Sequence, residues 1–133
     1  MNESQFKQKV LSCLRKQGWF CQNLESRQTG VGIPDTFIMR GGTRTFIEFK
    51  YDNKPYVSLS KVGWRPGQKS WALQYYMASG MKDTTYTVLG CKDKIVVIKM
   101  SRAVCIASTD DFRAYLGDYA IVNTIAEIQN CII

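Results

Sequence analysis

The stretch from Gly32 to Lys50 constrains the fold most, because it has the pattern of two short strands joined by a tight turn. A short strand with an apolar centre is expected over Asp35–Arg40, and Gly41-Gly42 follows it, a pair that permits the positive φ angles of a type I′ turn. A partner strand is expected over Thr43–Lys50. The stretch therefore predicts a β-hairpin at the centre of the chain.

Charged side chains occur at fixed places in this hairpin. Because side chains alternate between the two faces of a strand, Glu48 and Lys50 should share one face, while Ile47 and Phe49 point into a core. The turn would bring Asp35 of the first strand beside the acid and the lysine of the second. This arrangement is typical of a metal site.

The remaining elements follow from periodicity and from turn residues. Helices are expected over 3–16, with Asn2 as N-cap, over 68–78, and from Thr109 or Asp110 to Leu116. Strands are expected over 19–24, 85–89, 94–100 and 103–107, and the tail over 118–133 fits either a helix or a strand. The order predicts an α/β fold, a mixed sheet flanked by helices. At 133 residues we expect one domain, with a core of about 3–100 and an extension of about 101–133 used in packing or dimerisation.

The composition narrows the chemistry. A net charge of +7 favours a polyanionic partner, and the chain has no histidine. Histidine-based catalysis and histidine-ligated zinc are therefore excluded. The five cysteines form no CxxC pair, which argues against a zinc site and a disulfide framework. A hard cation held by carboxylates, Mg²⁺ or Mn²⁺, suits the residues that remain.

No apolar run of the ~18 residues needed to cross a bilayer occurs in the sequence. The N-terminus also lacks the charged and then apolar pattern of a signal peptide. We therefore expect an intracellular protein.

Three motifs together carry a family resemblance: Gly32-Ile33-Pro34-Asp35, then Glu48-Phe49-Lys50, then Gln68 at the start of a helix. This set resembles the PD-(D/E)XK nuclease superfamily, and most of all its small VRR-NUC branch, which is similar to archaeal Holliday-junction resolvases. The resemblance covers roughly residues 3–90. It implies a restriction-endonuclease-like core in the order αβββαβ. It also implies a homodimeric Mg²⁺- or Mn²⁺-dependent endonuclease of recombination and repair that cuts branched DNA such as four-way junctions, encoded by a phage or a similar element.

The resemblance assigns roles to the hairpin residues. Asp35 and Glu48 would hold the metal together with the main-chain carbonyl of Phe49, and Lys50 would position or deprotonate the attacking water. The plain alternative is that Asp35 is a turn residue and that Glu48 and Lys50 form an exposed ion pair of little energetic value.

Two further residues belong to the site by resemblance alone. Gln68 would touch the lysine or the scissile phosphate, although it could equally be a solvent-facing helical residue. Glu3 would complete the metal shell, although a glutamate in the first turn of a helix is favoured by the helix dipole anyway.

Basic residues near these motifs are candidates for contacts with DNA: Arg27, Lys54, Lys61, Arg65 and Lys69. Aromatic residues between them, such as Tyr51, Tyr56 and Trp64, suit a phosphate track with stacking platforms. The alternative is an ordinary solvated surface.

Two other functions remain open at this point. The chain could be a non-catalytic DNA-binding module that keeps the nuclease fold, or it could be a duplex-nicking or restriction-type endonuclease. The intact set of two acids and a lysine argues against the first, and the short chain argues against the second.

Overall fold

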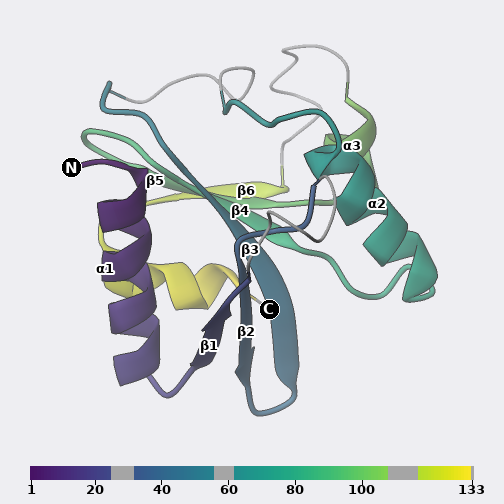
Figure 1. Cartoon of the computed structure of the whole chain (residues 1–133), viewed down its shortest axis with the longest axis horizontal. Helices are drawn as coiled ribbons and strands as arrows, with labels where there is room; N and C mark the ends of the chain where they lie inside the picture. Colours follow the sequence, from purple (N-terminus) through teal and green to yellow (C-terminus); the bar gives the residue numbers. More distant parts are fainter. Residues whose placement is uncertain (25–31, 56–61, 108–116, 133) are drawn as a thin grey trace.

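The computed structural model describes residues 1–24, 32–55, 62–107 and 117–132, and it contains one mixed six-stranded sheet with helices on both faces (Figure 1). The strands are β1 (Phe20–Asn23), β2 (Thr36–Arg40), β3 (Thr43–Tyr51), β4 (Tyr86–Gly90), β5 (Ile95–Lys99) and β6 (Tyr119–Val122). The helices are α1 (Glu3–Lys16), α2 (Gln68–Ala78), α3 (Arg102–Ile106) and the 3₁₀-helix η3 (Ile125–Cys131). The predicted α/β class is confirmed.

The strands lie in the sheet in chain order, from β1 to β6. Every neighbouring pair is antiparallel except β3 and β4, which are parallel. A parallel pair needs a crossover connection, and α2 supplies it. The predicted hairpin is confirmed, because Arg40 of β2 pairs with Thr43 of β3 across a two-residue loop.

The helix α1 has the bounds that the sequence predicts. The side chain of Asn2 accepts a hydrogen bond from the Gln5 N–H, and the Gln5 side chain accepts one from the Asn2 N–H. This capping box satisfies two N–H groups that the helix leaves free. The apolar side of α1 (Phe6, Val10, Leu11, Leu14) is buried in the core that α1 and η3 form on one face of the sheet.

Strand β3 is buried on both faces. Ile47 and Phe49 have no exposed surface and belong to the core under α1, where the rings of Phe6 and Phe49 meet at 6.3 Å. Phe46 lies on the opposite face, with its ring 5.4 Å from the rings of both Trp71 and Tyr75 in α2. The predicted division of the two faces is therefore confirmed, and α2 is fixed over the face that carries Glu48 and Lys50.

The strand expected over 103–107 is wrong, because these residues lie in α3 and its C-cap. The β-branched Val104 and Ile106 suggested a strand. Ser101, however, accepts a hydrogen bond from the Val104 N–H and so starts a helix, and Val104 is the only buried residue of α3. In the tail, β6 and η3 show that both strand and helix form. The helix expected up to Leu116 lies outside the described residues.

None of the helices in the described ranges is long and apolar enough to cross a membrane.

Candidate functional site

Asp35 is placed by the point at which β2 begins. The first pair of β2 with β3 joins Thr36 to Ile47, so one further step along the hairpin puts Asp35 opposite Glu48. Beyond Ile47, strand β3 continues without β2 beside it. The carboxylate of Asp35 takes the place of a strand partner there, since its Oδ2 accepts a hydrogen bond of 3.0 Å from the Phe49 N–H.

Glu48 lies at the centre of the site. The residue is only 6% exposed. Its Oε1 accepts a 2.6 Å hydrogen bond from Nε2 of Gln68. The Nζ of Lys50 lies 3.8 Å from the same oxygen. The second oxygen, Oε2, is buried and has no hydrogen-bond partner among the described residues. One carboxylate oxygen of Glu48 therefore has unused acceptor capacity.

The surroundings raise the pKa of Glu48 to about 7. Burial is the largest cause, and the negative charge of Asp35 is the next; Lys50 and Arg65 act in the opposite direction. The charged form of Glu48 is thus disfavoured beside the Asp35 carboxylate. A divalent cation between the two groups would offset this effect.

The interpretation of Glu48 and Lys50 as an exposed ion pair is wrong. Lys50 is 9% exposed and Glu48 is less so. An ion pair on the surface adds little to the free energy of unfolding, and removing one partner costs little. A buried charge, in contrast, is costly unless an opposite charge or hydrogen bonds stabilise it. The structure therefore assigns these side chains to an enclosed polar site.

Gln68 is held in one orientation at the start of α2. Its Oε1 accepts a 2.7 Å hydrogen bond from the Arg65 N–H, so the amide nitrogen must face Glu48. The residue is 7% exposed, which contradicts a solvent-facing role. Among the described residues its partners are Glu48 and Arg65, whereas the sequence led us to expect Lys50 or a phosphate.

A cavity of about 450 Å³ opens beside this cluster. Glu3 of α1 and Lys50 of β3 both line it, so the structure brings the expected Glu3 next to the site. Asp52 also lines it, although it was not among the site residues expected from the sequence. Its signal is present in the sequence, because Asp52 follows Glu48 and Lys50 with the period of 2 that keeps side chains on one face of a strand.

The basic residues that the sequence predicts to contact DNA lie in different surroundings. Arg65 lines the same cavity, and Lys54 is exposed just after β3. The ammonium of Lys69, in contrast, donates a 3.1 Å hydrogen bond to the Ala107 carbonyl and lies 4.7 Å from the centroid of the Trp64 ring. Arg27 and Lys61 lie outside the described residues.

The donor set fits a hard divalent cation. Asp35 and Glu48 offer carboxylate oxygens, and one of them is buried without a partner. No group of three or more Asp, Glu, Cys or His side chains surrounds a common point in the described part of the chain. A cation here would take its remaining ligands from water, from substrate oxygens and from main-chain carbonyls, as Mg²⁺ commonly does.

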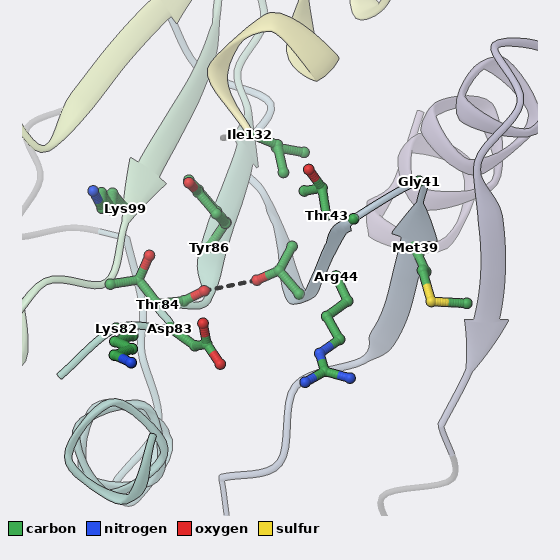
Figure 2. Close-up of a pocket in the computed structure, with 12 residues that line it drawn as sticks. Met39, Gly41, Thr43, Arg44, Lys82, Asp83, Thr84, Tyr86, Lys99 and Ile132 are labelled. Atoms are coloured by element: carbon green, nitrogen blue, oxygen red, sulfur yellow. Dashed lines mark hydrogen bonds between the residues drawn. The ribbon is translucent and has the colours of Figure 1, made fainter. Parts of the chain in front are cut away.

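A second cavity, of about 440 Å³, lies at the other end of β3, beside the turn between β2 and β3 (Figure 2). Its lining includes Arg44, Lys82 and Asp83. A 2.7 Å hydrogen bond from Thr45 Oγ1 to the Thr84 carbonyl joins β3 to the segment before β4. The site residues that the structure describes are not part of this lining. It therefore provides control positions far from Asp35 and Glu48.

No family model and no curated protein sequence matches the chain. Among solved structures, the chain is similar to Hjc from Archaeoglobus fulgidus, a Holliday junction resolvase from an archaeal hyperthermophile. The TM-score is 0.57 and the identity is 16%, and the match covers 94% of this chain and 98% of that chain. At this identity the likeness shows the fold, and the chain therefore has a restriction-endonuclease-like core.

Proposed function

We propose that the protein is a metal-dependent endonuclease that hydrolyses phosphodiester bonds in branched DNA. The observation that carries the proposal is the buried Glu48, which has one oxygen without a partner, Asp35 opposite it and Lys50 on its own face. A buried glutamate beside a half-buried aspartate and a buried lysine has little structural purpose, whereas each part has a use in phosphodiester hydrolysis.

Asp35, Glu48 and the Phe49 carbonyl would hold Mg²⁺ or Mn²⁺, and Glu3 would reach the same shell from α1. The cation would supply Lewis acidity and a more acidic bound water. Lys50 would orient the attacking water and neutralise charge that develops on the phosphate. Gln68 binds one oxygen of Glu48 and leaves the other without a partner among the described residues.

Branched DNA, such as a four-way junction, is the proposed substrate class. The resemblance of the sequence motifs to resolvases and the fold shared with Hjc both favour it. The charge of +7 and the exposed Lys54 and Arg65 suit a DNA backbone.

We also propose that the protein acts as a homodimer, because a four-way junction presents pairs of equivalent strands to a twofold-symmetric protein. Phe20 and Met39, which pair in the register of β1 and β2, are 55% and 41% exposed. Light scattering on the purified protein tests this part separately from catalysis.

Cleavage of a labelled four-way junction and of the matched linear duplex, with Mg²⁺ or with EDTA, tests the activity. Asp35→Asn and Glu48→Gln preserve shape but remove the charges, and we expect both to abolish cutting. Asp83→Asn, at the far cavity, is the control and should cut normally. Equal cutting by Glu48→Gln and the unaltered protein would contradict the proposal.

Junction binding without cleavage under every metal condition would instead favour the non-catalytic DNA-binding module. Equal cutting of duplex and junction would favour a nicking or restriction-type enzyme. The assay therefore separates all three functions.

A further inference from the structure

Gly32 of the Gly-Ile-Pro-Asp motif lies against the residue that precedes Gln68. A Cβ atom built on Gly32 would lie only 2.1 Å from the carbonyl oxygen of Gly67 and 3.0 Å from the Gln68 nitrogen. Both contacts are with main-chain atoms, which have no rotamer to change. A side chain at position 32 therefore requires a movement of the backbone.

The two glycines also share a backbone conformation. The φ angle of Gly32 is +96° and that of Gly67 is +93°, in the region that disfavours residues with a side chain. Gly67 is the N-cap residue of α2 and has no side-chain cap of its own. The close contact thus joins the loop before β2 to the first residue of α2.

Each side of this contact leads directly to one of the two acids. Gly32 precedes Asp35 by three residues, and the intervening Pro34 fixes one backbone angle. Gly67 precedes Gln68, whose amide holds the Oε1 of Glu48. The contact therefore connects the segment that carries one acid to the side chain that orients the other.

We propose that the contact between Gly32 and Gly67 is a positioning device, which sets the place of Gln68 and so fixes the orientation of the Glu48 carboxylate beside Asp35. A side chain at position 32 displaces the start of α2 and breaks the bond between Gln68 and Glu48. The value of this device for metal binding rests on the proposed function, but the geometry itself does not.

Gly32→Ala tests the proposal, with Gly80→Ala as the matched control. Gly80 also has a positive φ, +73°, but a Cβ there would meet nothing within 4 Å. Both variants therefore add backbone strain, and only the first adds a collision. The first readout is the side-chain amide of Gln68 in ¹⁵N NMR without metal, and the second is Mn²⁺ affinity by calorimetry.

We expect Gly32→Ala to speed hydrogen exchange at the Gln68 side-chain amide and to weaken Mn²⁺ binding by about tenfold or more, as loss of an outer-shell partner does. Gly80→Ala should change neither. Combining Gly32→Ala with Gln68→Ala should weaken Mn²⁺ binding little further than Gln68→Ala alone, because both changes remove one interaction. Equal effects of Gly32→Ala and Gly80→Ala, or full additivity, would overturn the proposal.

A measurement on the unaltered protein covers the case in which Gly32→Ala does not fold. The proposal requires an NOE between the Hα protons of Gly32 and the backbone N–H of Gln68, and its absence would refute the contact. If the unaltered protein binds no Mn²⁺ while the NOE and the protected amide are present, the proposed function fails and the positioning contact stands.

Discussion

Gln68 donates a 2.6 Å hydrogen bond from Nε2 to Oε1 of the buried Glu48 and leaves Oε2 without a partner among the described residues. The two residues are twenty positions apart, one on α2 and one on β3. The bond satisfies the oxygen that points to the helix and leaves the other one available. Under the proposed function, Gln68 orients Glu48 for a cation without contacting the cation itself.

Gln68→Ala should therefore weaken cation binding at the proposed site without abolishing it. We expect Mn²⁺ affinity, measured by calorimetry, to fall by about 10- to 100-fold, the usual cost of losing an outer-shell partner. Gln74→Ala is the control, because Gln74 is exposed on the same helix and bonds to Ser70. Unchanged affinity in Gln68→Ala would show that the bond has no part in metal binding.

The raised pKa of Glu48 predicts how the metal-free protein responds to pH. An ordinary glutamate loses its proton near 4.5, whereas Glu48 in the folded state keeps it up to about 7. Between these values the folded protein binds more protons than the unfolded chain, so the free energy of unfolding falls as pH rises. The slope is at most about 1.4 kcal/mol per pH unit.

Urea denaturation in EDTA at a series of pH values measures this effect. Glu48→Gln cannot titrate, and its stability should lack the decline between about pH 5 and 7. Parallel curves for the two proteins would contradict the pKa shift. Since a cation needs the ionised carboxylate, the Mn²⁺ affinity of the unaltered protein should rise over the same range and level off above about pH 7.

More of the candidate site than of the C-terminal tail could be predicted from the sequence. Side chains alternate between the two faces along β3, and the Gly41-Gly42 turn sets the pairing of β2 with β3. These two local features were enough to predict that Asp35, Glu48 and Lys50 lie together. The contact from Gln68 to Glu48 depends on how α2 crosses the sheet, and no local rule sets that. The same holds for Lys69, whose bond to the Ala107 carbonyl depends on α3.

The two errors have different physical causes. The residues of α3 have a composition that favours strands, but the Ser101 cap and the single buried side chain decide for a helix. The role of Gly32 was also missed, because a glycine required by close approach looks in sequence like one required by a turn. The missing information was the position of Gly67, thirty-five residues later in the chain.

Lys50→Ala should separate cleavage from binding. Lys50 is 9% exposed, and its ammonium lies 3.8 Å from Glu48, so it is placed to act on the reacting groups rather than on a distant phosphate. We expect junction cleavage to fall by about 10²-fold or more, the usual scale for loss of a positioned catalytic group. Junction affinity in a gel-shift assay without metal should change little.

Lys54→Ala is the matched control for this experiment, because Lys54 is exposed and lies four residues further along the chain. It should weaken binding modestly and leave cleavage of the bound junction unchanged. If Lys50→Ala weakened binding as much as cleavage, its role would be docking instead of catalysis.

Arg65 and Lys69, four residues apart, should respond differently to truncation. Arg65 is exposed and lines the cavity beside Lys50, whereas the Lys69 ammonium is engaged with the Ala107 carbonyl and the Trp64 ring. Arg65→Ala should weaken junction binding and reduce the slope of log affinity against log salt concentration by about 1.

Lys69→Ala should leave that slope unchanged and lower the free energy of unfolding by about 1 kcal/mol, because it removes a hydrogen bond and a cation–π contact between α2 and its neighbours. Gel shifts at several salt concentrations and urea denaturation measure the two effects. A reduced salt slope in Lys69→Ala would instead show that the ammonium leaves the Trp64 ring to bind a phosphate, and Lys69 would then belong to the DNA surface that the sequence predicted.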